Sequence, residues 1–118
     1  MKYNFRFDEL SYSDGDKDLI IIVEEKIQLV ATFLMSDIQG SDPQYVFEAI
    51  DKVLSGESGY EELNGNVCGV EIHKDKTQIY DNLAEDGMGN WCEIETTELR
   101  ELVDIWCNEL KKFKEHNK

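Results

Sequence analysis

Residues 19–35 read L-I-I-I-V-E-E-K-I-Q-L-V-A-T-F-L-M, which is two apolar runs separated by a short charged break. The first run, residues 19–23, is rich in β-branched side chains, which favour a central β-strand. In the second run, residues 27–35, apolar side chains occupy both odd and even positions, and this pattern predicts a long strand with two apolar faces. The fold is therefore expected to be built around these two strands.

The sequence before residue 19 predicts a third strand beside them. Tyr3, Phe5 and Phe7 alternate with polar side chains, which is typical of a half-buried strand. The pair Asp14-Gly15 readily supplies the positive φ angle that a tight hairpin turn requires. Residues 3–35 thus predict an antiparallel meander of three strands.

The next part of the chain predicts a helix followed by three or four strands. Pro43 suits the first turn of a helix, and Ser41 or Asp42 can cap its free amides. The apolar stripe of this helix, at helical spacing, consists of Val46, Phe47, Ile50, Val53 and Leu54. Short strands are expected over residues 60–63, 67–72, 77–81 and 91–94.

A second helix is expected to begin at Thr96 or Thr97, either of which can cap it. Its buried stripe consists of Leu99, Leu102, Val103, Trp106, Leu110 and Phe113. Lysines gather at its carboxyl end, where the helix dipole favours them. Residues 1–118 are therefore expected to form a single α+β domain with a mainly antiparallel sheet of six to seven strands and two helices, in the order βββ-α-βββ(β)-α.

The composition restricts the partners that this chain can bind. The 118 residues include 26 acids and 12 lysines and arginines, so the net charge is −14. This charge argues against a nucleic-acid or anionic-membrane surface, because both require basic patches. The first ten residues lack the apolar core of a signal peptide, and the three cysteines (Cys68, Cys92 and Cys107) fit a reducing compartment, so a cytoplasmic location is expected.

Motifs for catalysis or metal binding are weak. Asp14, Asp16 and Asp18 have the spacing of calcium ligands, but Leu19 stands where such a loop requires glycine. The two histidines belong to no hydrolase or metal motif, and no glycine-rich nucleotide fingerprint occurs. The sequence therefore predicts no catalytic residue, no metal site and no cofactor.

The acids themselves are the strongest functional signal. Residues 111–118 contain four lysines and one glutamate, so the other 110 residues carry a net charge of −17. Such a charge fits a surface that docks on a strongly basic protein, with aromatic anchors among the acids. Two segments combine these residue types. We expect the binding residues to be Glu57, Tyr60, Glu61 and Glu62 in the first segment, and Asp81, Glu85, Asp86, Trp91 and Glu93 in the second.

Four segments carry a resemblance to a known class of proteins. They are F-R-F-D-E-L (residues 5–10), Q-L-V-A-T-F-L-M-S-D (residues 28–37), N-x-C-x-V-E-I-x-K-D-K-T (residues 66–77) and C-E-I-E-T (residues 92–96). In these segments the chain resembles small acidic bacterial proteins encoded beside polymorphic or contact-dependent growth-inhibition toxins, several of which are immunity proteins. The resemblance implies that the chain binds one cognate toxin, a basic nuclease acting on transfer RNA, and occludes its active site.

Two other functions remain open at this point. The same charge suits a nucleic-acid mimic or regulatory adaptor that binds a DNA-binding protein. Paired acids such as Glu61-Glu62 also occur in carboxylate-based hydrolases, where the two carboxylates work in a cleft and one has a raised pKa. The identity of the partner separates the first alternative from an immunity protein, and a deep pocket with such carboxylates would favour the second.

Overall fold

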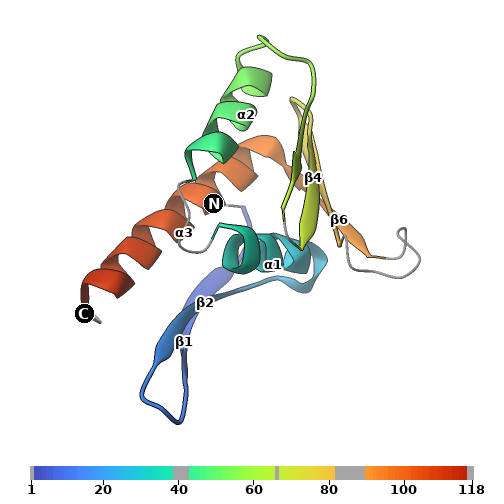
Figure 1. Cartoon of the computed structure of the whole chain (residues 1–118). Coiled ribbons are helices and arrows are strands. Elements are labelled where there is room, and N and C mark those ends of the chain that lie inside the picture. The colour runs from blue at the N-terminus through green and yellow to red at the C-terminus, as the bar shows by residue number, and fades with distance from the viewer. Residues whose placement is uncertain (1, 39–42, 66, 82–89, 117–118) are drawn as a thin grey trace.

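The computed structural model describes residues 2–38, 43–65, 67–81 and 90–116, which form an α+β domain with two antiparallel sheets (Figure 1). Strands β1 (Phe5–Ser11) and β2 (Lys17–Val23) pair as a hairpin. Strands β3 (Glu61–Asn64), β4 (Cys68–Ile72), β5 (Lys76–Asp81) and β6 (Trp91–Glu95) form the second sheet in chain order. The α-helices are α1 (Gln28–Asp37), α2 (Gln44–Leu54) and α3 (Thr96–His116).

The prediction of a strand over residues 27–35 is wrong, because this segment is helical. A 3₁₀-helix, η1 (Glu25–Ile27), leads directly into α1. The three-stranded meander and the single sheet of six to seven strands with two helices are therefore wrong as well. The described residues form a two-stranded and a four-stranded sheet with three α-helices, in the order ββ-αα-ββββ-α.

Residues 27–35 are apolar at both odd and even positions, which fits a helix, α1, that is buried on most of its circumference. It contacts β2, the three strands β4, β5 and β6, and α3. A continuous apolar run does not distinguish a buried strand from a buried helix by its periodicity. The distinguishing signal is polar: Gln28, Thr32 and Ser36 recur at four-residue spacing, and Gln28 and Ser36 are exposed.

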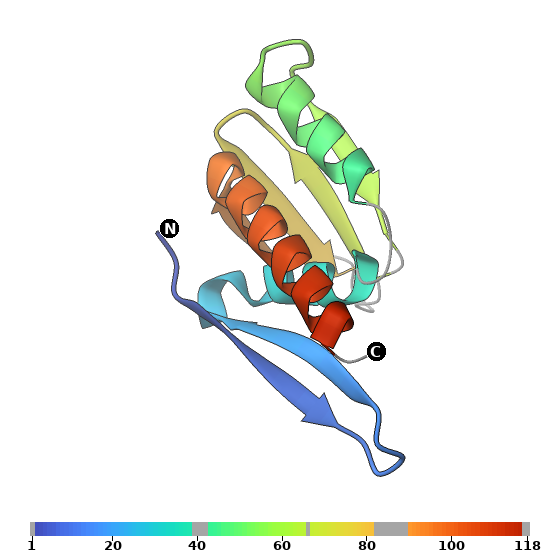
Figure 2. The same ribbon diagram turned by 90° about the vertical axis from the view of Figure 1, so that its left-hand side faces the viewer.

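All three helices lie against one face of the four-stranded sheet, and no helix of the described residues covers the other face (Figures 1 and 2). Cys68, Val70 and Ile72 of β4 point into this layer and are buried, as their alternation predicts. The predicted stripes of α2 and α3 also face the core. Their buried members are Val46, Ile50 and Val53 of α2, and Leu99, Leu102, Val103, Trp106 and Leu110 of α3.

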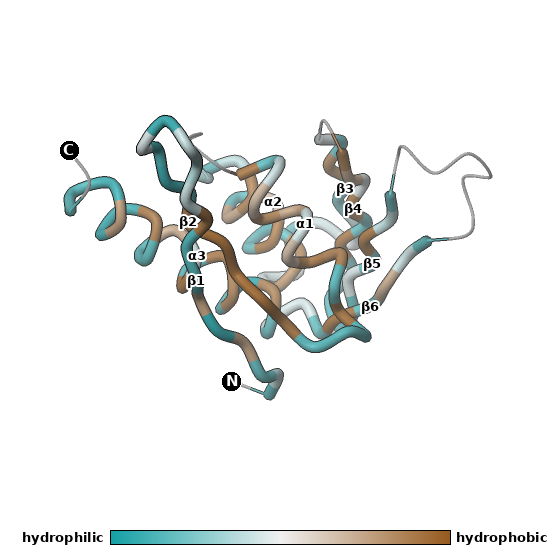
Figure 3. Tube along the Cα trace, turned by 90° about the horizontal axis from the view of Figure 1, so that it is seen from below, coloured by the Kyte–Doolittle hydropathy of each residue, from teal (hydrophilic) through white to brown (hydrophobic). Residues whose placement is uncertain are grey.

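The hairpin packs on α1 through β2, and an aromatic contact joins it to the longest helix. Phe7 of β1 stacks on Trp106 of α3, with ring centroids 6.4 Å apart and an angle of 23° between the ring planes. A two-stranded hairpin is only marginally stable by itself, so this packing stabilises it. Its turn contains Gly15 at a φ of 93°, which confirms the predicted Asp14-Gly15 turn. The turn is hydrophilic, whereas β2 is apolar from Leu19 to Val23 (Figure 3).

Asp37 ties the end of α1 to the four-stranded sheet. Its carboxylate is buried and accepts hydrogen bonds from the backbone N–H groups of Val67, at 3.1 Å, and Cys68, at 3.0 Å. A Cβ atom at Gly65 would lie 2.4 Å from the Asp37 carboxylate, so only glycine permits this approach. The carboxylate thus supplies a hydrogen-bond acceptor that these two backbone amides, at and just before the start of β4, would otherwise lack.

A second carboxylate joins the amino-terminal segment to β6. Glu95 accepts a hydrogen bond from the Tyr3 hydroxyl at 2.8 Å and contacts the ammonium groups of Lys76 at 3.0 Å and Lys2 at 3.1 Å. The hydrogen bond from Tyr3, followed by that from Lys76, lowers the pKa of Glu95 to about 2. The ionised form of Glu95 is therefore favoured by the folded state.

This arrangement predicts a loss of stability in acid. Because the pKa of Glu95 in the folded state lies below its ordinary value of 4.5, its contribution is present above pH 4.5 and is lost as the pH falls toward about 2. Glu95→Gln should flatten the dependence of the free energy of unfolding on pH in this window. Urea unfolding of both proteins across the window measures the effect. Equal slopes for the two proteins would show that Glu95 does not contribute.

Candidate functional site

The sheet face opposite the helices carries three rows of side chains in register, one of which pairs Lys76 of β5 with Glu95 of β6. Alternate residues of a strand point to opposite faces, so the neighbours of the buried positions line this one. The second row consists of Glu62, Glu71, Gln78 and Glu93, which are paired in register across β3 to β6. The third row consists of Asn64, Gly69, Tyr80 and Trp91. We call this surface, together with Tyr60 at its edge, the open face.

The carboxylates of the open face are only partly neutralised, because Lys76 is bound to Glu95 and also interacts electrostatically with Glu93. Glu62 and Glu71 lie directly opposite each other, a placement that is unfavourable for like charges. Within the described residues, Glu62, Glu71 and Glu93 form no ion pair. The open face is therefore a concentrated negative surface.

Aromatic side chains lie beside these carboxylates. Trp91 is 56% exposed and Tyr60 is 40% exposed. The Tyr80 ring lies across Gly69, where an added Cβ atom would stand 2.3 Å from Tyr80 Cε2. Burial raises the pKa of Tyr80, and the negative charges of Glu62 and Glu71 raise it further. The Tyr80 hydroxyl is therefore influenced by the carboxylates of the neighbouring row.

Tyr60 extends the open face at the β3 edge. Its hydroxyl donates a hydrogen bond to Glu62, and its ring centroid lies 5.0 Å from that of His73. This hydrogen bond raises the pKa of Tyr60 and lowers the pKa of Glu62. Glu62 is thus held as a carboxylate in a fixed position beside an exposed aromatic ring.

The structure brings four of the nine sequence-predicted binding residues together on the open face: Tyr60, Glu62, Trp91 and Glu93. Glu61 and Asp81 pair with Ile72 and Cys68, so they lie on the helix side of the sheet and do not join the open face. Glu57 is exposed in the turn after α2, and Glu85 and Asp86 lie outside the described residues.

The sequence-based set omits an acid and an aromatic residue of the open face, Glu71 and Tyr80. Each lies in the middle of a strand whose alternate positions are buried, and that alternation is the signal that could have placed them. Their position next to Glu62 and Trp91 depends on the pairing of the strands, which the local pattern does not define. The contact residues as a set stay a prediction.

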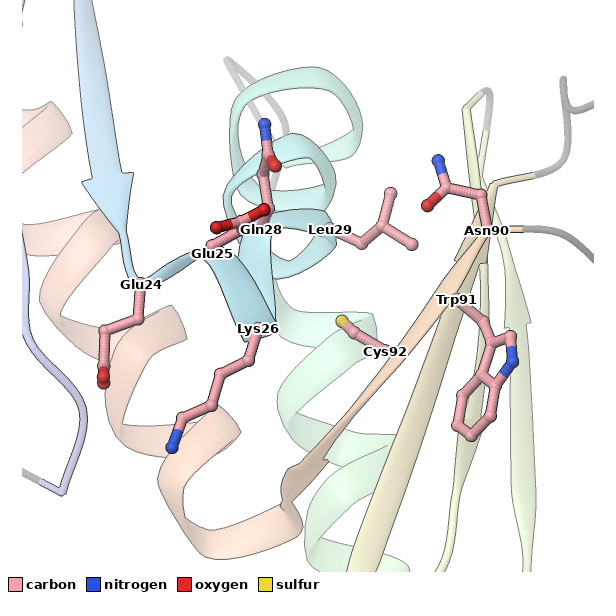
Figure 4. A pocket seen from close by; sticks show the side chains of 8 residues that line it. All are labelled: Glu24, Glu25, Lys26, Gln28, Leu29, Asn90, Trp91 and Cys92. Carbon is pink, nitrogen blue, oxygen red and sulfur yellow. The ribbon is translucent and has the colours of Figure 1, made fainter.

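A groove of about 710 Å³ adjoins the open face at Trp91 (Figure 4). It is lined by Glu24, Glu25, Lys26, Gln28, Leu29, Asn90, Trp91 and Cys92. Figure 4 shows Cys92 pointing toward α1 and Trp91 pointing to the opposite side of β6.

Two polar side chains of the groove, Glu24 and Lys26, contact the amino-terminal segment. The Glu24 carboxylate accepts a hydrogen bond from the backbone N–H of Asn4 at 3.0 Å, and the Lys26 ammonium lies 5.2 Å from the Tyr3 ring centroid. Burial raises the pKa of the Cys92 thiol, against a smaller effect of the backbone N–H groups of Leu29 and Val30. The thiol is therefore held in its neutral, weakly nucleophilic form.

The described residues contain neither a metal-binding cluster nor a membrane-spanning helix. No group of three or more histidine, cysteine, aspartate or glutamate side chains in these ranges could hold a metal ion. None of the helices in the same ranges is long and apolar enough to cross a bilayer. The acidic hairpin turn is tied internally, since the Asp16 N–H donates to Asp14 at 3.0 Å and the Tyr12 hydroxyl donates to Asp18 at 2.8 Å.

Comparison with known proteins identifies the family. A Bacillus cereus protein named immunity protein is 42% identical to this chain over 114 residues, which are 97% of this chain and 93% of that protein. The chain belongs to this family of immunity proteins. This membership confirms the immunity character that the four segments suggested. No model of a known protein family matches the chain, and no solved structure matches it.

Proposed function

We propose that this immunity protein neutralises a cognate toxin by binding it, without catalysis, and that the toxin is a basic nuclease of a polymorphic or contact-dependent growth-inhibition system. The observation that carries this proposal is the 42% identity with a protein named immunity protein. An immunity protein implies a toxin as its partner. The net charge of −14 and the open-face carboxylates that form no ion pair among the described residues support a basic partner.

A nuclease is the class of toxin that best fits an acidic inhibitor. A nuclease holds phosphate groups with lysine and arginine side chains, so its active cleft is basic. An acidic inhibitor that covers this cleft excludes the nucleic acid and needs no catalytic group of its own. We further propose that the toxin cleaves transfer RNA, that this protein inhibits it by occluding its active site, and that the inhibition takes place in the cytoplasm.

The first test measures toxicity and stoichiometry together. Cells that express the toxin domain encoded beside this gene should grow only when this protein is co-expressed. In vitro, the nuclease activity of that domain should fall linearly and reach its minimum at one equivalent of the protein. Complete inactivation by a small fraction of an equivalent would indicate catalytic detoxification and contradict the proposal, as would unchanged toxicity.

Association with the toxin should depend strongly on salt. Long-range attraction between an anionic and a cationic surface is screened as the Debye length falls from about 10 Å at 0.1 M to about 3 Å at 1 M salt. The association rate constant should fall by about tenfold or more over this range. Stopped-flow mixing at several salt concentrations measures it. A rate constant that does not change with salt would remove the electrostatic part of the proposal.

A further inference from the structure

We propose that the open face of the four-stranded sheet seats the toxin, and that its occupant is a lysine- and arginine-bearing surface of that toxin domain. The inference rests on the proposed function and adds to it the location and the chemistry of the contact. Its basis, within the described residues, is a sheet face that no helix covers, three carboxylates that form no ion pair, and aromatic rings beside them.

The carboxylates define the charge of the occupant. Glu62 and Glu71 face each other across β3 and β4, and Glu93 lies in the same row on β6. This arrangement weakens the free sheet, because like charges on neighbouring strands repel. A lysine or arginine side chain placed between them removes the repulsion and forms charge-assisted hydrogen bonds. The gain is made only in the complex, so the face is complementary to a basic surface.

The aromatic rings define the central contact. Trp91 is more than half exposed and lies beside Tyr80, whose ring is fixed across Gly69. Tryptophan and tyrosine are enriched among the residues that dominate binding energy, and arginine stacks well on their faces. Glu93 lies two residues from Trp91 on the same side of β6. A toxin arginine stacked on Trp91 would therefore lie near the Glu93 carboxylate.

The hairpin turn provides a matched comparison on the same molecule. It carries three acids, Asp14, Asp16 and Asp18, and an aromatic residue, Tyr12, which is 49% exposed. Asp14 and Asp16 lie in the turn and Asp18 lies in β2, so the three acids belong to a two-stranded hairpin and not to the four-stranded sheet. The open face and the hairpin turn thus offer the same charge and a similar aromatic exposure on different scaffolds.

The experiment compares the two surfaces by titration calorimetry with the toxin domain encoded beside the gene. On the open face the variants are Trp91→Ala and the triple change Glu62→Gln, Glu71→Gln, Glu93→Gln, which keeps side-chain shape. On the hairpin they are Tyr12→Ala and the triple change Asp14→Asn, Asp16→Asn, Asp18→Asn. Both open-face variants should raise the Kd by about 30-fold or more. Both hairpin variants should stay within about threefold, because rim charges contribute little.

The outcomes separate the inference from the function on which it rests. Open-face variants that bind as tightly as the wild type, or hairpin variants that lose as much affinity, would overturn the inference and leave the function standing. A wild-type protein that does not bind the toxin domain would reject both. Circular dichroism verifies folding, and the charge reversal Glu93→Lys, at an exposed position, provides a further variant with the same expected loss.

Discussion

Replacing Trp106 with alanine is expected to lower the free energy of unfolding by about 3–5 kcal/mol, the range for removal of a large buried aromatic side chain. Trp106 is completely buried in α3 and stacks on Phe7 of the hairpin. The change therefore leaves a cavity and also removes an aromatic contact between the hairpin and α3. Urea unfolding followed by circular dichroism measures the loss.

Trp91→Ala is the control for this prediction, because it removes the same side chain from an exposed position. Its effect on the free energy of unfolding should be about 0.5 kcal/mol or less, as for most surface substitutions. If the two variants lost similar stability, either Trp106 would not be a core residue or Trp91 would not be a surface residue.

The second large effect is expected at Asp37. Asp37→Ala removes the acceptor of the Val67 and Cys68 N–H groups and should lower the free energy of unfolding by about 2–4 kcal/mol, since each amide that loses its partner costs about 1–3 kcal/mol. Asp37→Asn keeps one acceptor oxygen and should lose less. Thermal and urea unfolding of the three proteins measure the order.

A surface carboxylate gives the matched control for Asp37. Asp51 of α2 pairs with Arg100 of α3 at 2.7 Å, but both side chains are largely exposed. Asp51→Ala should therefore cost about 1 kcal/mol or less. A loss at Asp51 equal to that at Asp37 would contradict the view that the buried amides, and not an ion pair, make Asp37 important.

Much of the fold could be predicted from local sequence patterns. The stripe from Leu99 to Leu110 and the threonines before it predict α3, and strict alternation over residues 68–72 predicts β4 with its buried face. The segment of residues 27–35 failed because a helix that is buried on most sides loses its periodic contrast. The polar residues Gln28, Thr32 and Ser36, at four-residue spacing, were the remaining signal of a helix.

The candidate site was predicted less completely, for a reason that lies in the strand pairing. Tyr60, Glu62, Trp91 and Glu93 could be chosen as acids and aromatics near loops. Their common face depends on the register that sets Glu62 against Glu71 and Tyr80 against Trp91. A shift by one residue moves a side chain to the opposite face, which is why Glu61 and Asp81 point toward the helices.

The open face is tested most directly by coupling its carboxylates to the toxin with a carbodiimide, which joins a carboxylate to a lysine amine in contact with it. The complex with the cognate toxin domain is treated with this reagent, digested and analysed by mass spectrometry. The account predicts cross-links from Glu62, Glu71 and Glu93 to toxin lysines. Cross-links confined to the hairpin acids Asp14, Asp16 and Asp18, with the open-face glutamates unmodified by the toxin, would contradict it.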